Sequence, residues 1–257
     1  MLSAVVWGLV QGLTEFLPVS SSGHLVIIPA FLSKLGIDVA QPGLAVSAVL
    51  HLGTLAAVLV YFRADVMKVL RLAKDSEGRK LAMLVGIGTL PALVGLPLEG
   101  SVERFGESVS NVGWALVGTG LILAVGHRLA RGTRSLLEGR VPDAIVVGVA
   151  QAIALIPGIS RSGTTITAGN ARGFSPTEAA RFSFLLGIPA IVGAGLLELP
   201  EVIESGALGW ELLAGFVVAA VAGYLSIAWL LSVIKGIGLL PFSIYCLTVG
   251  VLTVVVF

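Results

Sequence analysis

The stretch "VWGLVQGLTEFLPVSSSGHL" (6–25) is an apolar segment that polar residues interrupt near its centre. The same pattern returns 140 positions later as "VVGVAQAIALIPGISRSGTT" (146–165). Identical residues of the two copies are Val6 and Val146, Gly8 and Gly148, Gln11 and Gln151, Ser20 and Ser160, Ser22 and Ser162, and Gly23 and Gly163. A second match, "LHLGTLAAV" (50–58) with "FLLGIPAIV" (184–192), follows in the same order. These matches predict an internal repeat.

The composition predicts an integral membrane protein. Of the 257 residues, 56% are apolar and 12% are charged, and the mean hydropathy is +1.01. A chain with so few charges would not stay soluble if its outer surface faced water. The formal net charge of +1 gives no sign of a nucleic-acid partner, and none is expected. The lone Cys246 excludes an intramolecular disulfide and is expected to be a buried thiol.

The fold class predicted is an all-α membrane domain over 1–257, with six transmembrane helices and two re-entrant helical hairpins. A membrane-spanning helix needs about 20 apolar residues. Stretches near that length are 44–62, 80–98, 112–128, 178–198, 209–232 and 238–257. Two more apolar regions, 2–35 and 144–171, are broken by Pro, Gly and Ser into pieces too short to cross. Such breaks are tolerated only where protein or water surrounds the tip, which predicts hairpins.

The repeat predicts an inverted topology. One hairpin and three spans make up each half, 1–130 and 141–257, so an odd number of crossings places the second copy upside down. The connections 63–80 and 128–140 are rich in Lys and Arg and are expected in the cytoplasm. The connections 99–111 and 198–211 are acidic and are expected outside. The two hairpins should therefore approach each other from opposite faces of the membrane.

The hairpin tips have the residues of an oxyanion site. A helix that begins after each Ser-rich tip has unpaired N–H groups and the positive end of its dipole, which together bind phosphate. Arg161 adds a guanidinium that suits phosphate oxygens, and a mid-membrane Arg is costly without a function. The predicted phosphate-binding residues are Ser20, Ser22, Gly23, Ser160, Arg161, Ser162, Gly163 and Thr165.

Catalytic groups accompany this predicted anion site. Glu15 is too costly to bury without a cation, a partner or a proton. Gln11 lies one helical turn before it, so that the two side chains could hold one divalent ion jointly. His24 follows Ser21 by three residues, close enough to take its hydroxyl proton or to attack phosphorus itself. The predicted catalytic residues are Glu15, Ser21, His24 and Arg161.

The motifs "QGLTEFLPVSSSGHL" (11–25) and "PGISRSGTT" (157–165) resemble the undecaprenyl pyrophosphate phosphatase family linked to bacitracin resistance. The resemblance extends over essentially the whole chain. It implies hydrolysis of undecaprenyl diphosphate to undecaprenyl phosphate and inorganic phosphate, which recycles the lipid carrier for cell-wall synthesis. It also implies a bacterial plasma-membrane enzyme that uses Mg²⁺ or Ca²⁺, with a site open to the periplasmic or outer face.

By this resemblance, Gln11 and Glu15 correspond to an acidic pair that binds the metal. Ser21 and His24 correspond to the candidate nucleophile and base, and Ser160, Arg161 and Thr165 to phosphate-binding residues. One departure from the fully acidic form of the pair is Gln11, which brings one negative charge fewer to a metal.

Several alternatives stay open at the level of sequence. The attacking group is Ser21, His24 or water, and the base is His24 or Glu15. A transporter or flippase for an anionic lipid or small anion is the second functional hypothesis, because inverted repeats with broken helices are typical of that class. A packing or hydrogen-bonding role is expected for His51. The oligomeric state is left open between a monomer and a homodimer.

Overall fold

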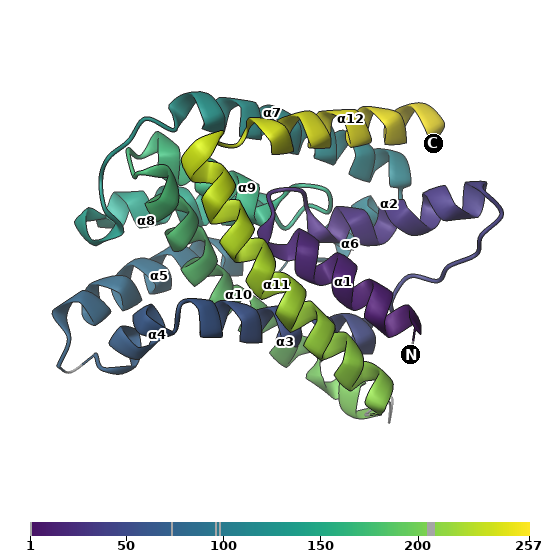
Figure 1. Cartoon of the computed structure of the whole chain (residues 1–257), viewed down its shortest axis with the longest axis horizontal. Coiled ribbons are helices and arrows are strands. Elements are labelled where there is room, and N and C mark those ends of the chain that lie inside the picture. The colour runs from purple at the N-terminus through teal and green to yellow at the C-terminus, as the bar shows by residue number, and fades with distance from the viewer. Residues whose placement is uncertain (1, 73, 96, 98, 205–208) are drawn as a thin grey trace.

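The computed structural model describes residues 2–72, 74–95, 97, 99–204 and 209–257, and within these ranges it consists of helices and their connections, without a β-strand (Figure 1). The helices are α1 (Leu2–Phe16), α2 (Ser21–Lys34), α3 (Leu44–Tyr61), α4 (Arg63–Leu70), α5 (Ser76–Val94), α6 (Glu99–Gly106), α7 (Val109–Leu129), the 3₁₀ turn η2 (Leu136–Glu138), α8 (Val141–Ile153), α9 (Arg161–Ala171), α10 (Pro176–Glu204), α11 (Trp210–Gly236) and α12 (Leu240–Val256). The predicted connection 198–211 lies partly outside the described residues, as do positions 96 and 98 of the predicted span 80–98.

Both interrupted regions are pairs of short helices. The helices α1 and α2 have 15 and 14 residues, and α8 and α9 have 13 and 11. At about 1.5 Å per residue, none reaches the roughly 30 Å of a bilayer core. The breaks fall at 17–20 and 154–160, where Pro18 and Pro157 stand. The two breaks are thus confirmed, while the depth of the tips in a membrane stays a prediction.

Four of the six predicted spans are confirmed as helices long and apolar enough to cross a membrane: α3, α7, Pro176–Leu196 within α10, and α11. The helix α5 begins at Ser76, where the Asp75 side chain caps it, so that its first turns hold charged residues and its apolar part is short. The helix α12, with 17 residues, is shorter than each of the four confirmed spans. The total of six spans is therefore not confirmed.

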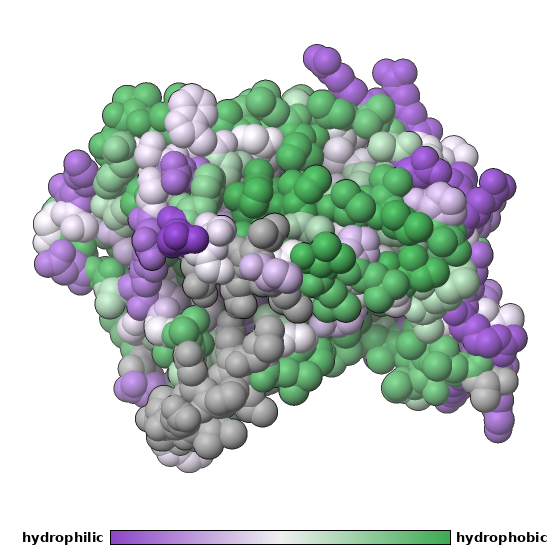
Figure 2. Space-filling model, turned by 180° about the vertical axis from the view of Figure 1, so that it is seen from behind, coloured by the Kyte–Doolittle hydropathy of each residue, from purple (hydrophilic) through white to green (hydrophobic). Residues whose placement is uncertain are grey.

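The surface agrees with a multi-pass membrane protein. Figure 2 shows hydrophobic side chains across the middle of the molecule, with hydrophilic side chains gathered at the right and left edges. Exposed large apolar residues occur on most of the long helices, among them Leu121, Leu213 and Val221. Burying this band in lipid removes it from water, and the hydrophilic edges then meet the two aqueous sides.

Glycines bring the hairpin helices close to their neighbours. A Cβ atom on Gly8 of α1 would lie 2.6 Å from the carbonyl oxygen of Gly215 on α11. Likewise, a Cβ on Gly148 of α8 would clash with the carbonyl oxygen of Gly88 on α5. Small residues allow such close backbone packing inside membranes. Each hairpin therefore packs on a long helix of the other half of the chain, although the division into two repeats stays a prediction.

A buried ion pair fixes the base of the second hairpin. Asp143, near the start of α8, accepts hydrogen bonds from Arg134 Nη2 at 2.8 Å and Arg172 Nε at 2.7 Å. The Asp143 side chain is 1% exposed. Arg134 also lies over the Phe174 ring, 5.1 Å from its centroid. These contacts tie the α7–α8 connection to the end of α9, and so they fix where the tip between α8 and α9 can reach.

Candidate active site

The first tip connects α1 to α2 through a backbone that few residues adopt. Ser20 has φ 68° and ψ 100°. A residue with a side chain is strained at a positive φ. Its hydroxyl accepts a hydrogen bond from Gly23 N at 3.3 Å and so caps α2. This turn places Ser21 back against the end of α1, beside Glu15.

The second tip is held by α7. Gly158 has φ 94°, a conformation that favours glycine, and its carbonyl accepts a hydrogen bond from Thr119 Oγ1 at 2.8 Å. Thr119 Oγ1 in turn accepts from Ser160 N at 3.0 Å. Ser160 caps α9 by accepting from Gly163 N at 3.1 Å. These hydrogen bonds to α7 hold the backbone immediately before Arg161, the first residue of α9.

The two tips lie against each other. Ser162 Oγ of the second tip donates to the Leu17 carbonyl of the first at 3.1 Å. A Cβ on Gly23 would lie 3.3 Å from the Gly158 Cα. Arg161 Nη2 donates to Glu15 Oε1 at 2.7 Å. The structure thus brings together residues that are 146 positions apart in the chain.

Glu15 is the centre of this contact. Its other oxygen, Oε2, accepts from Ser21 Oγ at 2.8 Å and from Gln11 Nε2 at 2.9 Å. Only 8% of Glu15 is exposed, so its charge is balanced mainly by the Arg161 guanidinium. Because a carboxylate that accepts from a serine hydroxyl can also take its proton, the pair has the geometry of a base and its nucleophile.

A small cavity of about 170 Å³ opens onto these groups. Its walls are Thr14, Glu15, Ser20, Ser21, Ser22, His51, Ala154, Ile159, Ser160 and Arg161. Of the predicted phosphate-binding residues, Ser20, Ser22, Ser160 and Arg161 line it. Gly23, Ser162, Gly163 and Thr165 do not: Thr165 Oγ1 instead bonds to Ser183 Oγ at 2.7 Å and to the Arg161 carbonyl at 2.7 Å, behind the wall.

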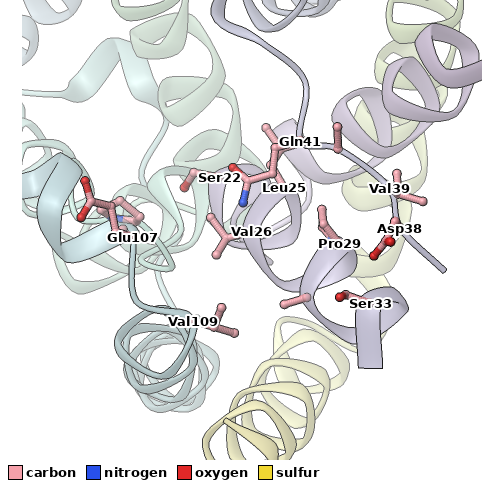
Figure 3. A pocket seen from close by; sticks show the side chains of 14 residues that line it. Ser22, Leu25, Val26, Pro29, Ser33, Asp38, Val39, Gln41, Glu107 and Val109 are labelled. Carbon is pink, nitrogen blue, oxygen red and sulfur yellow. The ribbon is translucent and has the colours of Figure 1, made fainter. Parts of the chain in front are cut away.

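A larger groove of about 1130 Å³ adjoins this cavity and shares Ser22 with it. Figure 3 shows Leu25, Val26 and Pro29 of α2 along one wall and Val109 of α7 on the other. The acidic side chains of Asp38 and Glu107 also line it. The groove therefore extends from the cavity to the segment between α2 and α3 and to the start of α7.

His24 points away from Ser21. Its Nδ1 lies 2.8 Å from the Ser20 carbonyl oxygen, and its Nε2 lies 2.6 Å from the Tyr245 hydroxyl on α12. The two rings are stacked with their centroids 5.7 Å apart. Of the two bases that the sequence leaves open, Glu15 is the one in contact with Ser21. Sequence reasoning did not select Tyr245.

His51, for which the sequence predicts a packing or hydrogen-bonding role, belongs to the candidate site. It stands on α3 and lines the cavity, with Nε2 4.0 Å from Glu15 Oε2. The expectation of a hydrogen-bonding role is met only at its other nitrogen, which lies 2.9 Å from the Ser47 carbonyl oxygen. A sequence signal did exist, because Leu185 occupies the matching position in the second copy of the repeat.

Comparison with known proteins identifies the family. The family model described as bacitracin resistance protein BacA matches residues 4–252. This chain belongs to the BacA family. Relatives named undecaprenyl-diphosphatase include one from Synechococcus sp. RCC307, 44% identical over 96% of this chain and 90% of its own length. Others come from Thermomicrobium roseum, 42% identical over 98% and 96%, and Methanosphaera stadtmanae, 38% identical over 99% and 97%.

The side chains around the divalent ion that the sequence predicts at Glu15 and Gln11 form a hydrogen-bonded cluster, and the ion itself stays a prediction. Both Glu15 oxygens already accept hydrogen bonds, and Gln11 turns its amide nitrogen, a donor, toward Glu15. Within the described residues, no three His, Cys, Asp or Glu side chains group together as metal ligands. Mg²⁺ usually binds through one or two carboxylates together with substrate phosphates and waters, and Glu15 is one such carboxylate in this cavity.

Proposed function

We propose that this protein hydrolyses the terminal phosphate of undecaprenyl diphosphate, giving undecaprenyl phosphate and inorganic phosphate. The observation that carries the proposal is the hydrogen bond from Ser21 Oγ to Glu15 Oε2, opposite the Arg161 guanidinium on Glu15 Oε1. A nucleophile, a base and a phosphate-binding cation then share one cavity. The BacA family assignment and the names of the relatives agree with this activity.

In the first step, Ser21 Oγ attacks the terminal phosphorus. The new bond joins Oγ to phosphorus, the bond between phosphorus and the bridging oxygen breaks, and undecaprenyl phosphate leaves. The hydroxyl proton of Ser21 passes to Glu15 Oε2. Arg161 has five N–H donors, so Nη2 can hold Glu15 while others bind the phosphoryl oxygens. Fixed positive groups of this kind supply most of the stabilisation in phosphoryl transfer.

The groove beside Ser22 supports an outward opening of the site. It is lined by 38–41 and by Gly106, Glu107 and Val109, and these last three lie in the connection predicted outside by the charge pattern. Substrate would then enter from the outer leaflet of the bacterial plasma membrane, and the lipid carrier would be recycled there for cell-wall synthesis. Mg²⁺ or Ca²⁺ dependence stays a prediction, in which Glu15 would hold the ion together with phosphate oxygens of the substrate.

The transporter hypothesis is not favoured. Carrying an anion across the membrane requires donors such as Arg161 but no serine held against a carboxylate. The relatives are named as phosphatases, and this agrees with the Ser21–Glu15 pair.

The test is phosphate release from undecaprenyl diphosphate by the purified full chain, followed by trapping of the phosphorylated protein. We expect inorganic phosphate and a phosphoserine at Ser21, both of which Ser21→Ala should remove. Phosphohistidine at His24 would move the nucleophile there, and turnover without any phosphorylated residue would assign the attack to water. No phosphate release at all would contradict the function itself.

A further inference from the structure

The hydrolysis of a phosphorylated Ser21 favours a second base. In the first step, which belongs to the proposed function, Glu15 Oε2 receives the Ser21 proton. When water later attacks the phosphoserine, the Ser21 oxygen must leave and take a proton back, and Glu15 is the group in contact with it. Glu15 cannot accept the proton of the water at the same moment, so this step would be faster with a second side chain as the base.

The walls of the cavity offer one such group. Among the described residues that line it, Thr14, Ser20, Ser22 and Ser160 have neutral hydroxyls, and Arg161 has no acceptor. Ala154 and Ile159 contribute no ionisable side chain. His51 is left, and imidazole is the commonest proton acceptor in catalysis.

The hydrogen bonds of His51 leave the correct nitrogen free. Nδ1 lies 2.9 Å from the Ser47 carbonyl oxygen, and a carbonyl only accepts, so Nδ1 has the hydrogen in the neutral ring. Nε2 then has its lone pair and lies on the side of the cavity, 4.0 Å from Glu15 Oε2. The His51 side chain is 24% exposed, compared with 7% for Glu15, so water can reach it.

We infer that His51 is the general base of the second step, an assignment that rests on the proposed function. Water gives a proton to His51 Nε2 while its oxygen bonds to phosphorus. The bond between phosphorus and Ser21 Oγ breaks, and Glu15 Oε2 returns its proton to Oγ. Inorganic phosphate leaves and the His51 proton passes to solvent, which restores every group. Glu15 thus acts as the base of the first step and the acid of the second, whereas His51 acts only as the base of the second.

The test measures the two products separately in the first turnover of His51→Gln. Glutamine approximates the size of the ring but cannot act as a base. We expect a burst of about one undecaprenyl phosphate per protein at the wild-type rate. The release of inorganic phosphate should be slower than in wild type by at least about 100-fold. Phosphorylated Ser21 should accumulate, and imidazole should speed phosphate release from His51→Ala. The matched control is His127→Gln, on α7 outside the cavity, in which both products should appear together.

Two results would overturn the assignment to His51. If both products slow equally in His51→Gln, His51 acts before the phosphoserine forms or only holds the fold. If both keep the wild-type rate, another group activates the water. Failure of the proposed function would look different, because the wild-type protein itself would then release no phosphate.

Discussion

Among single residues, Glu15 connects the most separate parts of the candidate site. Arg161 comes from the second tip, Ser21 from the first turn of α2 and Gln11 from α1, and all three bond to its two oxygens. A carboxylate so far from water is stable only with such partners. The same arrangement therefore determines both the fold of the tips and the chemistry proposed for them.

Replacing Glu15 by Gln tests both roles. We expect turnover to fall by at least about 100-fold, because the base of the first step is lost. Arg161 would also lose its counter-charge, and breaking a buried ion pair costs about 3–5 kcal/mol of unfolding free energy. Phosphate release and thermal unfolding in the same detergent measure the two effects. Ser21→Ala is the comparison, since it should stop turnover while leaving the ion pair. Wild-type turnover in Glu15→Gln would remove the carboxylate from the mechanism.

Arg161→Lys keeps the charge but removes the planar fork. A lysine cannot hold Glu15 and two phosphate oxygens at once, so we expect transition-state stabilisation to fall by roughly 2 kcal/mol or more, seen in kcat/KM. Arg63→Lys, at an exposed position on α4, is the matched control and should behave as wild type. Equal kcat/KM in the two variants would make Arg161 structural.

The sequence predicts Glu15 and Arg161 because a charge in an apolar segment is costly and so needs a reason. Its only signal for His51 is the mismatch with Leu185 in the second copy of the repeat, and one histidine in a continuous helical pattern does not show which side chains will face it. The sequence predicts that Gly23 and Gly163 bind phosphate through unpaired N–H groups, because each stands near the start of a helix. The structure uses their N–H groups in the caps formed by Ser20 and Ser160, so these donors are already occupied.

Among the elements, the hairpins depend on close helix packing. Pro, Gly and Ser in the sequence predict where each helix breaks, and the breaks at 17–20 and 154–160 agree. The partners of α1 and α8 could not be predicted, because small residues permit close packing without specifying a neighbour. The bounds of α5 differ from the predicted span 80–98 for a related reason: the Asp75 cap starts the helix at Ser76, among charged residues that an apolar count does not include.

Gly148→Ala tests the packing of the second hairpin. The added Cβ would meet the Gly88 carbonyl, and overpacking of this kind costs about 1–3 kcal/mol. We expect a lower unfolding temperature and reduced phosphate release, because α8 supports the tip that presents Arg161. Gly86→Ala on the neighbouring α5 is the control, since no atom lies within 4 Å of its Cβ. It should be neutral or stabilising by up to about 1 kcal/mol. Equal unfolding temperatures would show that α8 can move without cost.

At the scale of the whole molecule, the basic connection between α4 and α5 lies at the opposite end from both termini. In Figure 1 the α4–α5 connection lies at the left, whereas both termini and the α2–α3 connection lie at the right. The positive-inside pattern assigns the first end to the cytoplasm. The sequence can give this assignment because it depends on composition alone, whereas the contact between the two tips depends on three-dimensional packing.

Labelling of single cysteines tests this orientation in intact cells. In a Cys246→Ala background, Ser76→Cys and Thr133→Cys should react with a membrane-impermeant thiol reagent only after the membrane is opened. Glu107→Cys should react from outside. All three positions are exposed, so a difference in labelling reports the side of the membrane and not burial. Cys246 is removed as a precaution, although it is buried against Pro18. Because α5 is not among the four helices that are long and apolar enough to cross a membrane, the pair Ser76 and Glu107 is decisive. Labelling of both from the same side would mean that α5 does not cross, and the inverted arrangement of the hairpins would then be wrong.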